Sequence, residues 1–214
     1  KFLTQAKQQQ PSWGHPVLLE AGIYDQQGKP QQALERYAQA IDLGESNPRA
    51  FSRMVDLLTQ AGRYAEAEQM LGRLKERQET LSAMDLRREG EIKSMQGDLE
   101  GALAIAQQVA PDSDKYQDHV WLGRLLALKG QRAEADGNVD EARQFVVDAE
   151  KSLRRAVELD DKTAETWVPL IYFLNGTKQT QSAEEALNAA AAKIPRDKAP
   201  LAMARCYEAM HRTD

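Results

Sequence analysis

Apolar residues recur at intervals of three and four along most of the chain, and short polar breaks divide them into stretches of helical length. The clearest breaks contain Gly28-Lys29-Pro30, Gly62-Arg63 and Gly97-Asp98. Glycine ends a helix readily because it accepts the left-handed conformation, and proline is tolerated in the first turn of the next helix. The pattern therefore predicts pairs of helices joined by tight turns, at 17–27 and 31–43, at 50–61 and 64–77, and at 83–96 and 99–109.

The helix pairs repeat at a nearly constant period. A glycine is followed five residues later by an alanine in three places, and the glycine period continues to a fourth, with spacings of 34, 35 and 33 residues; these positions are Gly28/Ala33, Gly62/Ala67, Gly97/Ala102 and Gly130. Self-similarity at this period indicates one supersecondary unit copied in tandem, in which each copy buries its apolar face against its neighbours. We therefore expect function to lie on surfaces.

Equivalent positions of the units carry matching side chains. The first helices place a small or aliphatic residue at Ala21, Val55, Gly90, Gly123, Ile171 and Ala204, and a larger one three residues later, except at Lys93. The second helices place alanine at Ala33, Ala67, Ala102, Ala149 and Ala183. This arrangement resembles the tetratricopeptide repeat (TPR) family, whose helical hairpin is about 34 residues long. The resemblance implies an all-α fold, a right-handed α-solenoid of helix-turn-helix repeats.

The resemblance divides the chain into one array with incomplete ends. We expect repeats at 14–47, 48–82, 83–115, 116–163 and 164–196, with partial repeats at 1–12 and 197–214. The chain is expected to begin and end inside a larger protein. The last helix then lacks its partner, so that part of its apolar face is exposed or covered by self-association through the ends.

The repeat at 116–163 contains an insertion. Gly130 and Ala149 are 19 residues apart instead of five, and the additional 14 residues keep a helical pattern. We expect each helix of this hairpin to be about seven residues longer, which places Gly130 inside a helix and the turn at 136–138. Phe145 and Val147 lie near the tip. They either cover one another, which is the interpretation we favour, or form a partner-binding finger.

Composition and net charge limit the classes of partner that we expect the chain to bind. The 214 residues carry a net charge of −5, which gives no general attraction to nucleic acid or to an anionic membrane surface. No apolar run approaches the roughly 20 residues needed to span a bilayer. Cys206 is the only cysteine and allows no intramolecular disulfide, which leaves localisation open, with the cytoplasm slightly favoured. A protein or peptide partner is therefore expected.

The sequence contains few patterns that indicate catalysis or metal binding. Nucleotide-binding, zinc-protease and paired-cysteine motifs are absent, and no nucleophile has an evident base. Cys206 and His211 are five residues apart, a poor spacing for joint metal binding on a helix. Asp136, Asn138 and Asp140 resemble the start of a calcium loop but lack its central glycine. We expect no enzyme activity, cofactor, metal or catalytic residue.

The family resemblance implies a concave groove lined by the first helices. Its expected binding residues are mainly arginines and aromatics, namely Arg49, Arg53, Arg87, Arg88, Trp121, Arg124 and Tyr172. A guanidinium binds a carboxylate through two parallel hydrogen bonds, so an acidic peptide is one candidate ligand. The alternative, which we consider stronger, is that the arginines pair with nearby carboxylates such as Asp56 and Glu91.

These observations predict a non-catalytic protein-interaction scaffold that binds a peptide or partner helix in its concave groove. One alternative is a structural repeat module of a larger secretion or enzyme assembly. Another is an RNA-binding helical repeat, which is less favoured because Asp56 and Glu91 interrupt the basic residues of the groove.

Overall fold

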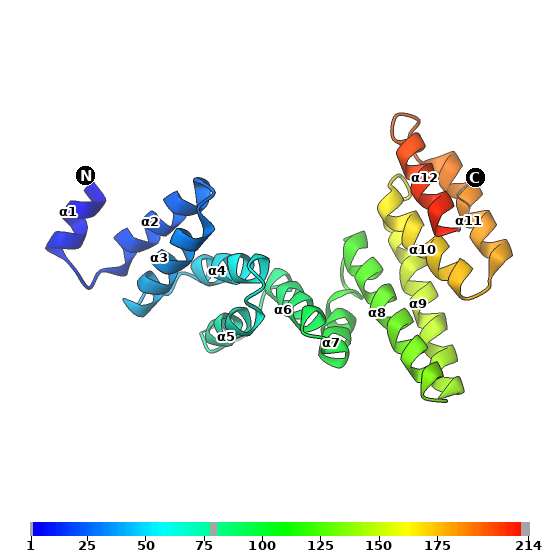
Figure 1. Cartoon of the computed structure of the whole chain (residues 1–214), viewed down its shortest axis with the longest axis horizontal. Helices are drawn as coiled ribbons and strands as arrows, with labels where there is room; N and C mark the ends of the chain where they lie inside the picture. The colour runs from blue at the N-terminus through cyan, green and yellow to red at the C-terminus, as the bar shows by residue number, and fades with distance from the viewer. Residues whose placement is uncertain (1, 78–80, 211–214) are drawn as a thin grey trace. The chain divides into compact units, whose positions relative to one another are not determined.

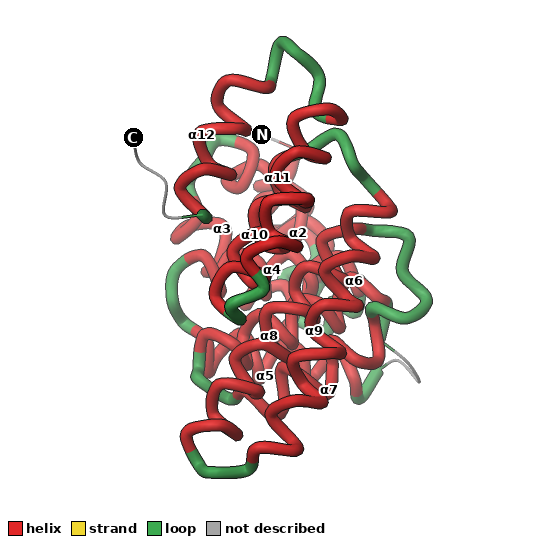
Figure 2. Tube along the Cα trace, turned by 90° about the vertical axis from the view of Figure 1, so that its right-hand side faces the viewer, coloured by secondary structure: helices red, strands yellow, loops and turns green. Residues whose placement is uncertain are grey.

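The structure is a computed structural model that describes residues 2–77 and 81–210. Every regular element in these residues is a helix (Figures 1 and 2). The chain forms two compact units, Lys1–Asp98 (unit 1) and Leu99–Asp214 (unit 2). The predicted all-α fold class is confirmed within the described ranges.

Unit 1 is built of helices that pack against their neighbours in sequence. Its elements are α1 (Phe2–Gln9), α2 (Gly14–Gln26), α3 (Pro30–Asp42), α4 (Pro48–Gln60), α5 (Tyr64–Lys75) and α6 (Ala83–Met95). Phe51, Val55 and Leu58 of α4 are fully buried among Ala33, Leu71 and their neighbours. Small residues at the helix crossings let the backbones approach, and the larger side chains fill the remaining space.

The turns of unit 1 follow the sequence prediction. Gly28, Gly62 and Gly97 have φ angles of 68°, 71° and 80°, a region that only glycine enters without cost. The amide of the next residue closes each turn by donating to a carbonyl in the last turn of the preceding helix, as Arg63 does to Leu58 over 2.9 Å. The glycine period therefore marks the ends of helices α2, α4 and α6.

Unit 2 has its own core. Its elements are α7 (Leu99–Val109), α8 (Tyr116–Ala135), α9 (Val139–Leu159), α10 (Ala164–Gly176), α11 (Thr180–Lys193) and α12 (Ala199–Ala209). Leu153, Leu170, Ile171 and Leu174 are its most deeply buried large side chains. They come from α9 and α10, the two helices at the middle of this unit.

The insertion lengthens both helices of one hairpin. Helix α8 has 20 residues and α9 has 21, whereas α10 has 13. Gly130 lies inside α8, and Gly137 makes the turn with a φ of 82°. Phe145 is partly buried against the core, while Val147 is 59% exposed. The lengths and the turn agree with the expectation from the sequence.

The last helix of the described chain is only partly covered. Leu201 and Tyr207 of α12 are exposed, whereas Cys206 and Met210 are buried. The predicted partial repeat at 197–214 extends beyond the described residues, and His211 lies outside them. The limits of the individual repeats, and their joining into one array, remain predictions.

Candidate functional site

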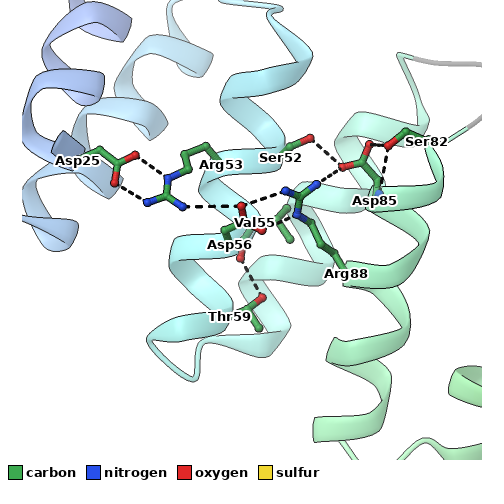
Figure 3. Close-up of polar contacts among 9 residues, drawn as sticks. All are labelled: Asp25, Ser52, Arg53, Val55, Asp56, Thr59, Ser82, Asp85 and Arg88. Atoms are coloured by element: carbon green, nitrogen blue, oxygen red, sulfur yellow. Dashed lines mark hydrogen bonds and ion pairs between the residues drawn. The ribbon is translucent and has the colours of Figure 1, made fainter. Parts of the chain in front are cut away.

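A ladder of ion pairs joins the first helices of unit 1 (Figure 3). Arg53 on α4 donates from Nε and Nη2 to the two carboxylate oxygens of Asp25 on α2, over 2.6 and 2.7 Å. Arg88 on α6 donates in the same bidentate manner to Asp56 on α4, with Nη2 3.0 Å from Oδ2. Arg88 Nη1 also donates to Asp85 Oδ1 over 2.8 Å. We call these five residues the ion-pair ladder.

Asp85 anchors the ladder at α6. Its side chain is almost fully buried and accepts hydrogen bonds from the hydroxyls of Ser52 and Ser82, over 2.8 and 2.6 Å. The Ser82 hydroxyl in turn accepts from the Asp85 amide and caps the start of α6. A local helix cap therefore also fixes the carboxylate that faces Arg88.

The ion-pair ladder contains two of the predicted binding residues, Arg53 and Arg88. The hydrogen bonds from Arg53 hold the pKa of Asp25 below its ordinary value, because they favour the charged carboxylate. A ligand carboxylate would have to displace Asp25 from Arg53, or Asp56 and Asp85 from Arg88. Arg53 and Arg88 thus pair with nearby carboxylates, as the alternative from the sequence proposed. A role for them in ligand binding remains a prediction.

The other two arginines of unit 1 differ from each other. Arg87 is half-buried on α6 and already interacts with another group of the protein. Arg49 is exposed at the start of α4, and its guanidinium makes no ion pair with any described residue. It borders a hollow of about 350 Å³, together with Leu19 and Ile23 of α2. Arg49 is thus the predicted arginine of this unit that is most available to a ligand.

Unit 2 carries a larger depression, which we call the unit 2 groove. Its volume is about 1000 Å³, and its walls come from α8, α10 and α12, with α9 contributing part of the floor. The predicted residues Arg124 and Tyr172 line it, whereas Trp121 packs half-buried against the core and is not among its lining residues. Two of the three binding residues predicted in unit 2 therefore lie in one depression.

The lining combines apolar surface with charge. Leu128 is 42% and Tyr172 61% exposed, and Val146 and Val168 extend this apolar surface. Three cations and two carboxylates border it: Arg124, Lys178, Arg205, Glu134 and Glu208. Arg205 pairs with Glu165 over 3.1 Å, whereas neither Arg124 nor Lys178 pairs with a carboxylate in the described chain. The groove therefore contains two cations without an ion-pair partner in the described chain, Arg124 and Lys178, beside the two carboxylates.

The insertion builds one side of this groove. Gln131 and Glu134, in the last turns of α8, and Ala142 and Val146, in the first turns of α9, belong to the added length and line the depression. The added length of the hairpin therefore forms part of the wall of the groove.

Lys178 is a groove residue that the sequence reasoning missed. It lies in the turn after α10 and has a φ of 61°. A signal was available, because Lys178 precedes Ala183 by five residues, the spacing that relates glycine to alanine in the earlier repeats. The turn after α10 falls on Thr177 and Lys178.

The described residues show no arrangement suited to metal binding, and none of their helices has the length and apolarity to cross a membrane. Cys206 is buried in α12, and burial raises the pKa of its thiol to about 11. A thiol in this state is a poor nucleophile at neutral pH.

Comparison with known proteins identifies the repeats. The sequence profile of a family described as tetratricopeptide repeat matches residues 26–84, which contain the turns at Gly28 and Gly62. Residues 26–84 match the tetratricopeptide repeat family. No curated protein matches it.

Solved TPR structures share the fold at low sequence identity. One is described as YrrB, a TPR protein with an unusual peptide-binding site; it is 15% identical, with a TM-score of 0.71 over 97% of this chain and 98% of that one. A TPR protein from Parabacteroides merdae is 14% identical, with a TM-score of 0.71 over 93% and 74% of the two chains. MamA from Desulfovibrio magneticus is 15% identical, with a TM-score of 0.67 over 83% and 92%. These likenesses establish the fold.

Proposed function

We propose that this TPR protein is a non-catalytic interaction scaffold and that the unit 2 groove holds a peptide or helical segment of a partner protein. The observation that carries the proposal is the groove itself, in which exposed apolar side chains lie beside cations that lack partners in the described chain. Aromatic and arginine side chains dominate the affinity of most protein interfaces, and Tyr172 and Arg124 supply both kinds here.

The chemistry of the groove favours an amphipathic ligand. Leu128 and Tyr172 offer apolar contacts, and Arg124 offers two parallel donors to a carboxylate. The peptide-binding site attributed to YrrB belongs to a protein of the same fold and supports a peptide as the ligand class. An RNA ligand is less well supported, because the ion-pair ladder neutralises Arg53 and Arg88 and the net charge is −5.

A selection for binding peptides tests the proposal. Random dodecapeptides displayed on phage are selected on the whole chain, and the recovered peptides are synthesised and titrated by fluorescence anisotropy. Leu128→Glu places a charge on the apolar wall of the groove and should weaken these peptides by about tenfold or more, since loss of a central contact costs about 1.4 kcal/mol or more.

The matched control is Val147→Glu. Val147 is also an exposed aliphatic residue of the long hairpin but does not line the groove, so its substitution should change the affinity by less than about twofold. Peptides that bind both variants as tightly as the unmodified chain would show that the groove is not the binding site.

A further inference from the structure

Lys178 occupies a backbone position that the other hairpin turns give to glycine. In the turns after α2, α4, α6 and α8, the residue with positive φ is a glycine with φ between 68° and 82°. After α10 it is Lys178, the only non-glycine residue with positive φ in the described chain. The left-handed region is unfavourable for any residue with a Cβ and essentially free of cost for glycine.

The turn itself imposes this conformation. The Lys178 amide donates to the Asn175 carbonyl over 3.0 Å, and the Gln179 amide donates to Leu174 over 2.9 Å. Gly62 and the residue after it make the same two bonds after α4. Lysine therefore occupies a position where the backbone favours glycine, which points to a use for its side chain, since local strain is concentrated at functional positions.

The place of Lys178 indicates what that use is. It is exposed and lines the unit 2 groove just past the end of α10, on the same depression as Gln131 and Glu134 of the insertion. Its ammonium group pairs with no carboxylate of the described chain, although Glu134 lines the same groove. An ammonium group offers three hydrogen-bond donors to an anionic ligand.

We propose that Lys178 is a specificity-determining residue that binds an aspartate or glutamate side chain of a partner segment in the unit 2 groove. This inference rests on the proposed function. A segment with more than one acidic side chain fits better than a single terminal carboxylate, because the two cations of the groove that lack an ion-pair partner come from separate elements, Arg124 on α8 and Lys178 after α10.

The test separates stability from binding. Lys178→Gly relieves the backbone and should raise the urea midpoint of the whole chain, while it weakens the selected dodecapeptides by about tenfold. Lys178→Gln keeps the backbone conformation and removes the charge, so it should weaken the peptides to a similar extent without the gain in stability. Lys151→Gln, at an exposed position of α9 outside the groove, is the control and should leave the affinity unchanged.

The peptides themselves identify the carboxylate. They are synthesised with an amidated C-terminus, and each acidic residue is replaced in turn by its amide. One replacement should weaken binding to the unmodified chain by about tenfold and have little effect on Lys178→Gln, because the partner charge is already absent. Peptides that bind only with a free C-terminal carboxylate would overturn the assignment to a side chain.

The failures of the two proposals are distinguishable. Peptides that are weakened by Leu128→Glu, keep full affinity for Lys178→Gly and show no enrichment in acidic residues would overturn the role of Lys178 and leave the groove in place. A selection that yields no peptide sensitive to Leu128→Glu would overturn both proposals.

Discussion

At the scale of single residues, the ion-pair ladder shows how burial changes the value of a charge. Exposed pairs contribute little to stability, typically below about 1 kcal/mol. The carboxylate ends of the ladder are less exposed, since the Asp85 and Asp25 side chains are 7% and 17% accessible, although Arg53 is 39% accessible. The arginines also donate several hydrogen bonds to their carboxylates. We therefore expect these pairs to stabilise unit 1 measurably.

Asp25 provides the first test, through pH. Because Arg53 lowers the folded-state pKa of Asp25, the pair contributes stability that is present above the unfolded-state pKa and is lost as the pH falls through the folded-state pKa. Asp25→Asn should lower the free energy of unfolding at pH 7 by about 1 kcal/mol. It should also lose less stability than the unmodified chain as the pH falls from 5 to 2, measured by urea denaturation.

Glu66→Gln is the matched control. Glu66 also has its pKa lowered by an arginine, Arg63, but this pair lies at the start of one helix, and the Glu66 side chain is 52% accessible compared with 17% for Asp25. Its removal should have the smaller effect at pH 7 because solvent screens the pair. An Asp25→Asn variant with the full acid sensitivity of the unmodified chain would argue against the ladder as a stabilising feature.

The residue scale also shows what the sequence can and cannot predict. Gly28 and Gly62 could be assigned to turns because the requirement is local. The pairing of Arg53 with Asp25 could not, because the two residues are 28 positions apart and the choice among neighbouring carboxylates depends on how adjacent helices are staggered. Lys178 lay between these cases, since its spacing to Ala183 marks the turn but not the groove beside it.

At the scale of helices, the close contact between α8 and α9 depends on glycine. A Cβ at Gly123 would lie 2.7 Å from Leu153 Cγ and 3.3 Å from the Ala149 carbonyl oxygen. Leu153 is fully buried, so it has little room to move. Gly123→Ala should therefore lower the free energy of unfolding by about 1–3 kcal/mol, measured by urea denaturation.

Gly72→Ala supplies the comparison for that helix contact. Gly72 lies inside α5, and a Cβ there would meet nothing within 4 Å. This substitution should raise stability by about 0.5–1 kcal/mol, because alanine favours the helix more than glycine does. Equal effects of the two substitutions would show that helix propensity, rather than packing against Leu153, decides the outcome at Gly123.

The long hairpin illustrates the limit of prediction for helices. An addition of 14 residues with an unbroken apolar pattern is about four helical turns, so the extension of α8 and α9 followed from the sequence. The groove beneath it did not follow, because it depends on where α10 and α12 end relative to Gln131 and Val146. The sequence pattern does not indicate how the ends of these helices are offset from one another.

At the scale of the whole molecule, the two units have separate cores. The buried cluster around Phe51 and Leu58 contains only unit 1 residues, and the cluster around Leu153 and Leu170 contains only unit 2 residues. In repeat proteins, stability is approximately a sum of the stabilities of the repeats and of the interfaces between neighbours. A core substitution in one unit should therefore affect that unit most strongly.

Native-state hydrogen exchange tests this independence. Phe51→Ala removes a fully buried side chain and should lower stability by about 3–5 kcal/mol, with faster exchange in the amides of α2 to α5. Gly123→Ala should accelerate exchange in α8 to α10 and leave α2 to α4 nearly unchanged. If either substitution instead accelerated exchange equally in both units, the chain would unfold as one cooperative body, and the two cores would have to be coupled despite being built from separate residues.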